Sequence, residues 1–207
     1  MLNDNNFISA FVLLFILLNP FLIIVYVIDL VQEKSASQFS AILFRACIIS
    51  LLVFIIFALS GNAIFEDILQ TNFASFQIFG GLVFLIIGIR FIFQGVDVVR
   101  NLRGKSEHIA GAIAMPILIG PGSIGASIII GERLEPLWAI ISIATALILT
   151  YLIMVLLKAL HDYVKPRNEK LIQRYIEIMG RVTALVIGAF SIEMIMQGLK
   201  TWMKVMN

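Results

Sequence analysis

The chain has 207 residues, of which 60% are hydrophobic and 14% charged, and its formal net charge is +2. Its mean hydropathy is +1.02. Soluble domains are about half apolar and about a quarter charged, so this composition excludes an ordinary soluble globule and a disordered chain. The single cysteine, Cys47, excludes a disulfide framework and a thiolate metal site. The small net charge is not that of a nucleic-acid-binding protein. We therefore expect an all-α, multi-pass membrane protein.

Six stretches of the chain are long and apolar enough to form transmembrane helices, each of which needs roughly 20 residues to cross about 30 Å of hydrocarbon. They run over Phe7–Val31, Ala41–Ser60, Phe73–Gly95, Ile109–Gly131, Leu137–Leu157 and Ile176–Leu199. Because these runs are continuously apolar, without two-residue alternation, they do not read as strands. We treat residues 1–207 as a single transmembrane domain. The first stretch is predicted to be retained as a helix, since MLNDNN lacks the basic start of a signal peptide.

The distribution of basic residues predicts the orientation. If the N-terminus lies outside, ten of the fifteen Lys and Arg residues fall in inner segments and three, Arg133, Lys200 and Lys204, fall in outer ones. The positive-inside rule therefore favours both termini outside. The basic loops at residues 98–108 and 165–174 are interpreted as orientation anchors.

The two halves of the sequence resemble one another weakly, at an offset of 100 or 101 residues. The matching positions are residues 16–21 with 117–122, Gly80 with Gly180, and Gly88 with Gly188. Each half then holds three spans, and because three is odd the halves enter the membrane from opposite sides. This is the inverted repeat of many secondary transporters. The predicted repeats cover about residues 7–95 and 109–199; chance similarity between apolar segments is the alternative interpretation.

Proline interrupts the first and fourth stretches at matched positions. Pro20 and Pro121 each lie about 12 residues, or roughly 18 Å, from opposite faces of the membrane. Proline lacks an N–H and clashes with the carbonyl four residues earlier, so both helices are predicted to be discontinuous. Open backbone is tolerated at this depth only beside protein or a wet cavity. A single kink patched by neighbouring helices is the alternative, but two matched breaks near the midplane favour a binding site.

The chemistry of such breaks suits a zwitterion. Half-helices that start at the prolines expose N–H groups and positive dipole ends, which suit a carboxylate or another small anion. The carbonyls that end the preceding halves, together with the Asn19 amide oxygen, suit an ammonium group or a cation. The predicted substrate-binding residues are Asn19, Pro20, Phe21, Gly120, Pro121, Gly122 and Ser123.

Glu193 is the ionisable residue that most needs explanation. It lies about six residues, roughly 9 Å, inside the outer end of the last stretch, and a charge near the centre of a membrane helix costs about 2.5–3.5 kcal/mol. A carboxyl group removed from water is more easily protonated. We hypothesise that Glu193 couples transport to an ion, with a proton favoured over sodium. A structural hydrogen bond to a neighbouring helix is the equal alternative.

The segments LLNP in the first stretch, FGGLVFLI in the third and IGPGSI in the fourth resemble the MarC family, which includes the SnatA-type small neutral amino acid transporters. The resemblance covers nearly the whole chain. It implies a carrier of the bacterial inner membrane for glycine- or alanine-like amino acids, bound between the two broken helices. The partners it implies are that amino acid, a co-transported proton or sodium ion, and lipid, with no cofactor and no nucleic acid.

Two other classes of function stay open on the sequence. The first is a channel or facilitator for a small anion or polar solute, which paired half-helices also suit. The second is an intramembrane enzyme or a non-catalytic assembly factor. No Ser/His pair, Asp pair or His metal set falls within the six stretches, so we expect no enzymatic activity and no metal site.

Overall fold

The structure is a computed structural model that describes residues 4–61, 63–68, 70–94, 118–166 and 169–206. Throughout these ranges the regular structure is helical, without a strand, which confirms the all-α prediction. In chain order the elements are α1 (Asp4–Leu18), α2 (Pro20–Tyr26), α3 (Ile28–Glu33), α4 (Ala36–Ser60), the π-helix η1 (Ile64–Ile68), α5 (Phe73–Gln94), α8 (Pro121–Arg133), α9 (Pro136–Val164) and α10 (Glu169–Met206).

Four of these helices are long and apolar enough to cross a membrane: α4, α5, α9 and the part of α10 from Gly180 to Met203. They coincide with the second, third, fifth and sixth predicted stretches. The first predicted stretch is divided among α1, α2 and α3. Of the fourth, α8 forms the second half, and residues 109–117 lie outside the described residues. The basic loop at residues 98–108 also lies outside them.

Local sequence explains where the long helices begin and end. Before α4, the Gln38 N–H donates to Ser35 Oγ and the Ser35 N–H donates to Gln38 Oε1, both at 3.3 Å. This reciprocal capping satisfies two backbone donors that the helix leaves open. The helix ends at Gly61, whose φ of +58° is readily adopted only by glycine. In α9, Pro136 occupies the first turn, where its missing N–H removes no helical hydrogen bond.

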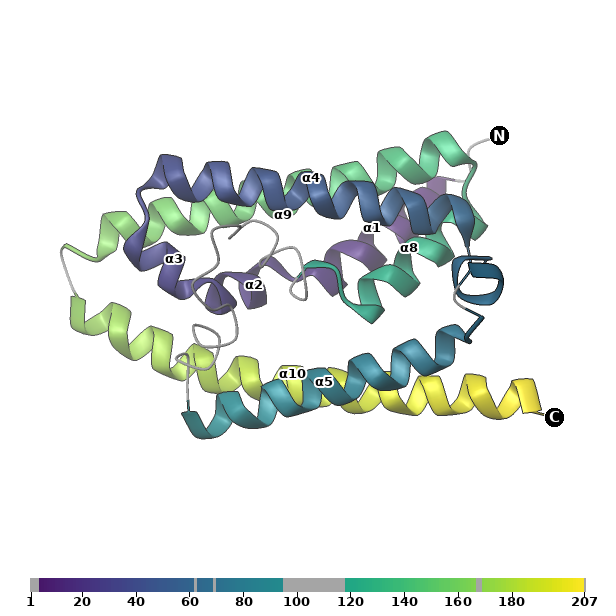
Figure 1. Ribbon diagram of the computed structural model, residues 1–207. Coiled ribbons are helices and arrows are strands. Elements are labelled where there is room, and N and C mark those ends of the chain that lie inside the picture. Colours follow the sequence, from purple (N-terminus) through teal and green to yellow (C-terminus); the bar gives the residue numbers. More distant parts are fainter. Residues whose placement is uncertain (1–3, 62, 69, 95–117, 167–168, 207) are drawn as a thin grey trace.

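The broken helices lie between two pairs of long ones (Figure 1). One pair is α4 with α9, and the other is α5 with α10, which lie side by side along their lengths. Between the pairs, α1 packs on α8 and α9, α4 also packs on α8, and α2 contacts both α9 and α10. Fully buried Leu14, Leu43, Phe54, Ile143 and Met154 form the apolar core of α1, α4 and α9.

Glycine residues bring the backbones of α5 and α10 into close contact. A Cβ atom built on Gly81 of α5 would lie 2.9 Å from the carbonyl oxygen of Ser191 on α10. One built on Gly88 would lie 3.3 Å from the backbone nitrogen of Gly188. Gly188 differs from its partner, because a Cβ there would meet nothing within 4 Å. Close backbone approach of this kind is typical of membrane helix packing.

A buried lysine ties α9 to the end of α3. Lys158 is 3% exposed, and its Nζ donates to the Val31 carbonyl at 2.7 Å and to Asp162 Oδ1 at 2.6 Å. The ammonium group thus binds a carbonyl near the C-terminus of α3, where cations are favoured. This contact anchors the last segment of the divided first stretch.

Candidate functional site

The first predicted break is present and centres on Asn19. This residue separates α1 from α2 and has a φ of +35°, in the left-handed region that asparagine tolerates better than most residues. The Asn19 N–H donates to the Phe15 carbonyl and the Ile23 N–H donates to the Asn19 carbonyl, both at 3.1 Å. Because Pro20 has no N–H, it cannot donate to the carbonyl of Ile16. The interruption is therefore one residue long.

At the second predicted break the structure describes the residues from 118 onward, and Gly120 directly precedes α8. Its φ of −116° and ψ of 168° are extended, and Pro121 opens the helix. The Gly120 N–H donates to Ser123 Oγ at 2.9 Å, and Ser123 Oγ donates to the Leu118 carbonyl at 2.7 Å, with the Gly120 carbonyl at 3.0 Å. The buried serine hydroxyl therefore clamps the break. It also occupies the Leu118 carbonyl, which the sequence had suggested for a cation.

The first turn of α8 keeps backbone donors that its own helix does not use. Pro121 has no N–H, and the Ile124 N–H donates to the Gly120 carbonyl at 2.9 Å. The N–H groups of Gly122 and Ser123 have no acceptor within the helix, as is general for a first turn. They lie at the positive end of the helix dipole. This segment of backbone is therefore suited to an anion.

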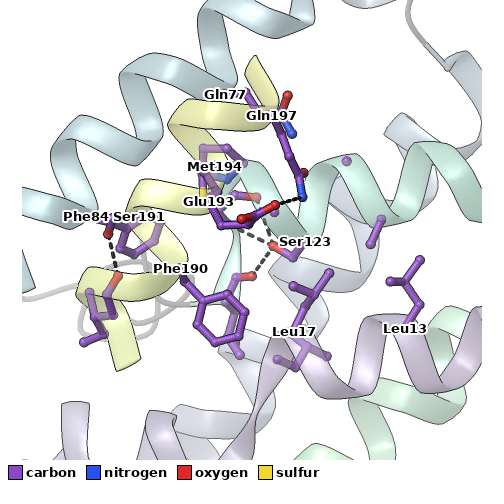
Figure 2. A pocket seen from close by; sticks show the side chains of 18 of the residues that line it. Leu13, Leu17, Gln77, Phe84, Ser123, Phe190, Ser191, Glu193, Met194 and Gln197 are labelled. Carbon is purple, nitrogen blue, oxygen red and sulfur yellow. Dashed lines mark hydrogen bonds between the residues drawn. The ribbon is translucent and has the colours of Figure 1, made fainter. Parts of the chain in front are cut away.

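A cavity of about 350 Å³ adjoins this turn and is bounded by α1, α2, α5, α8 and α10 (Figure 2). Most of its lining is apolar, with Leu13 and Leu17 of α1 and Phe73 and Phe84 of α5 among the contributors. The polar side chains that line it are Tyr26, Gln77, Ser123, Ser191, Glu193 and Gln197. The polar groups thus come mainly from α5, α8 and α10.

Glu193 lines the cavity and is held by its own helix. The Gln197 Nε2 donates to Glu193 Oε1 at 2.9 Å, and Figure 2 shows the two side chains meeting in the same region of the cavity as Ser123. Across the described residues the ion pairs are Lys158–Asp162 and Arg181–Glu177, so neither involves Glu193. Its carboxyl group therefore lies in a membrane-spanning helix without a cationic partner among those residues.

The cavity brings together five of the eight predicted functional residues, namely Gly120, Pro121, Gly122, Ser123 and Glu193. Asn19, Pro20 and Phe21 do not line it. Pro20 is buried in the packing, whereas the Phe21 side chain is 56% exposed. Contact with substrate stays a prediction for the seven proposed binding residues, and ion coupling stays a prediction for Glu193.

The divided first stretch lines the cavity with different residues from those predicted. Leu17 and Leu18 contribute from the end of α1, and Ile23 and Tyr26 contribute from α2. Pro20 and Phe21, the first two residues of α2, are not part of the lining. Of the two predicted half-helix N-termini, at Pro20 and Pro121, the one that lines the cavity is therefore that of α8.

Two amides of the cavity were missed by sequence reasoning. Gln197 follows Glu193 by four residues, a spacing that places two side chains on the same face of a helix. Gln77 was visible as a polar residue within the apolar stretch Phe73–Gly95. In the described part of the chain, no group of three or more His, Cys, Asp or Glu residues is arranged to hold a metal ion.

Comparison with known proteins identifies the family. Residues 5–203 match the family described as MarC family integral membrane protein, so the chain belongs to this family and is an integral, multi-pass membrane protein. It is similar to a UPF0056 membrane protein of Aquifex aeolicus, with 25% identity covering 96% of this chain and 94% of that protein. Proteins with the same description in Buchnera aphidicola (24%, covering 97% and 99%) and Archaeoglobus fulgidus (26%, covering 93% and 92%) are also similar. No solved structure matches the chain.

Proposed function

We propose that this MarC family member is a secondary transporter of small neutral amino acids, of the SnatA type, in the bacterial inner membrane. It moves glycine- or alanine-like substrates by alternating access, coupled to a proton in preference to sodium, and has no enzymatic activity. The observation that carries the proposal is the cavity of about 350 Å³ that joins the first turn of α8 to the carboxyl group of Glu193.

The size and lining of the cavity support a small zwitterionic substrate. Its volume is at the lower end of the roughly 300–1,000 Å³ typical of small-molecule sites. The N–H groups of Gly122 and Ser123 suit the substrate carboxylate. The apolar lining from α1 and α5 suits a hydrogen or methyl side chain and offers no charge to a larger polar one.

The packing of the helices supports two inverted three-helix repeats, at about residues 7–95 and 109–199. If α1 and α2 correspond to α8, α4 to α9 and α5 to α10, then the contact of α1 with α9 has its counterpart in α4 with α8. The contact of α2 with α10 has its counterpart in α5 with α8. Under the same correspondence, the pair α4–α9 maps onto itself, and so does the pair α5–α10. Rocking of one repeat against the other would then open the cavity to each side in turn.

The proposed topology has six spans with both termini outside. It predicts that Ser37 faces the cytoplasm and Glu135 the exterior, and both residues are exposed at helix boundaries. Because Cys47 is the single native cysteine and is buried, a Cys47→Ala background allows Ser37→Cys and Glu135→Cys to be labelled separately. A membrane-impermeant maleimide added to intact cells should modify the second variant alone; the reverse pattern would overturn the orientation.

Transport itself is tested with the whole protein in proteoliposomes. Vesicles preloaded with unlabelled glycine or alanine should take up labelled glycine by counterflow, and a pH gradient should change the steady-state level. A channel would instead give single-channel conductance without counterflow. Folded protein that moves neither amino acid would overturn the proposal. Unchanged proton-driven accumulation in Glu193→Gln would remove the coupling role of that residue.

A further inference from the structure

The cavity presents one carboxyl group to whatever occupies it. Among the described residues that line it, Glu193 is the acidic side chain, and Tyr26 of α2 is the other titratable one. α1, α5 and α8 contribute no charged side chain to the lining. Arg90 of α5 and the remaining charged residues of α10, including Lys200 and the Arg181–Glu177 pair, are not part of it. Within the described lining, the charge therefore depends on Glu193.

Glu193 is an exposed residue of the structure, and within a membrane-spanning segment an ionised carboxylate is favoured when a cation balances it. The Gln197 amide binds one oxygen at 2.9 Å, and neither ion pair of the described residues supplies a positive charge to Glu193. A charge within a membrane-spanning helix that has no partner is strongly disfavoured. A proton can remove the charge, and a cation, either sodium or the cationic group of a ligand, can balance it. They compete for the same oxygen atoms.

We propose that Glu193 binds the coupling proton and the ammonium group of the amino acid in turn, so that the carrier exchanges one proton for one substrate molecule. This inference rests on the proposed transport function and gives the coupling a direction. The first turn of α8 binds the substrate carboxylate, and Glu193 binds the other end. Gln197 keeps the carboxylate oriented toward the cavity.

Charge and atoms balance over the cycle. When substrate binds, the O–H bond of the Glu193 carboxyl group breaks, and its proton passes to water in the cavity. The carboxylate that remains accepts charge-assisted hydrogen bonds from the substrate ammonium group. When substrate leaves on the other side, water there returns a proton to Glu193. Because the zwitterion has no net charge, each cycle moves one positive charge opposite to the amino acid, and an inside-negative potential drives substrate outward.

The sign of the pH dependence of binding distinguishes exchange from cotransport. We would measure labelled glycine binding to the purified whole protein between pH 5 and 8, a range in which glycine stays zwitterionic. Exchange predicts that apparent affinity falls on acidification, by up to about tenfold per pH unit in the acidic limb, since proton and substrate binding are linked. It also predicts proton release into weakly buffered solution when glycine is added. Cotransport predicts that affinity rises on acidification.

Variants assign the effect to Glu193. Glu193→Gln should bind glycine more weakly, without pH dependence or proton release, whereas Glu193→Asp should retain both. Glu177→Gln is the matched control, because it removes a carboxylate from the same helix at a position that is 68% exposed and outside the cavity. Methylamine should compete with glycine in the wild type but not in Glu193→Gln, and acetate should compete in both.

The outcomes separate this inference from the proposed function. Glycine binding whose affinity is constant or rises on acidification would overturn proton exchange and leave amino acid transport standing. Proton release that persists in Glu193→Gln would also overturn it. If folded protein binds neither glycine nor alanine at any pH, the proposed function itself fails.

Discussion

Gly80 of α5 lies directly against the ring of Pro121, the residue that opens α8. A Cβ atom built on Gly80 would overlap Pro121 Cγ, and both residues are buried. The third predicted stretch therefore fixes the position of the second helix break. Any displacement of α5 relative to α8 alters the same turn whose N–H groups adjoin the cavity.

The first prediction concerns this contact. Gly80→Ala should lower the free energy of unfolding by about 1–3 kcal/mol, because the added methyl group must displace either α5 or the proline ring. Unfolding of the purified protein in detergent measures the change. Gly80→Ala should also weaken glycine binding, because the added methyl group moves the first turn of α8.

Gly188→Ala is the control for the effect that replacing glycine by alanine has on helix propensity. It adds the same methyl group to α10, where a Cβ atom would meet nothing within 4 Å. It should be as stable as the wild type or up to about 1 kcal/mol more stable, because alanine favours a helix interior over glycine. Equal stability of the two variants would show that the Gly80–Pro121 contact is not tight in the membrane protein.

The second prediction concerns the serine that clamps the break. In Ser123→Ala the buried Gly120 N–H loses its acceptor and the Leu118 carbonyl loses a donor. An unsatisfied buried group costs about 1–3 kcal/mol, so the variant should unfold more easily. Ser60→Ala is the comparison, because it removes a hydroxyl that donates to the Ile56 carbonyl at the exposed end of α4. If the two alanine variants behave alike, the hydroxyl of Ser123 does not hold the break.

Sequence reasoning located the break between α1 and α2 and the start of α8 because proline acts locally. The missing N–H of Pro20 and of Pro121 interrupts the helical hydrogen bonds whatever surrounds them. The long apolar helices could also be predicted from the sequence, because each depends on the composition of its own segment. The turn at Val27, which separates α2 from α3, was not predicted, and no proline or glycine marks it.

The lining of the cavity could be predicted only in part, because it depends on how separate helices are rotated against each other. Phe21 follows the first proline directly, yet its side chain is exposed outside the cavity. Gln77 enters the cavity because α5 packs with Gly80 against Pro121. That contact joins residues about 40 positions apart, and no local pattern in the sequence reports it.

The third prediction tests the cavity by filling it. A Cβ atom built on Gly122 would have one neighbour, Leu17 Cδ2 at 3.8 Å, which is an ordinary van der Waals distance. Gly122→Val should therefore fold and insert while its side chain occupies the space next to the first turn of α8. Glycine binding should be lost, with Gly122→Ala intermediate. Labelled-substrate binding to the purified variants measures the effect.

Gly188→Val provides the comparison for Gly122→Val. It adds the same side chain to a helical glycine that does not line the cavity. Its binding of glycine should match that of the wild type. Normal affinity in Gly122→Val, in protein that elutes as a single folded species, would count against substrate in this cavity.

The last prediction concerns the buried lysine that ties α9 to α3, and it follows from an asymmetry of exposure. The Lys158 side chain is 4% exposed, whereas that of Asp162 is 41% exposed. Asp162→Asn leaves a buried ammonium group with the Val31 carbonyl and without its counter-charge; the loss is about 3–5 kcal/mol in fully buried pairs, which is an upper bound here because water reaches Asp162. Lys158→Met leaves a carboxylate that water reaches and one carbonyl without its donor, or about 1–3 kcal/mol.

Counting lost hydrogen bonds would make Lys158→Met the less stable variant, because the lysine donates two bonds and the aspartate accepts one. We expect Asp162→Asn to be the less stable variant instead. The double variant Lys158→Met/Asp162→Asn should be more stable than Asp162→Asn alone, because the unpaired buried charge is gone. Unfolding of the three variants in detergent measures these differences in stability.

Glu177→Gln, which breaks the exposed pair with Arg181, is the control and should change stability by about 0–1 kcal/mol. A double variant less stable than either single one would mean that the ammonium group is not desolvated at the end of α3.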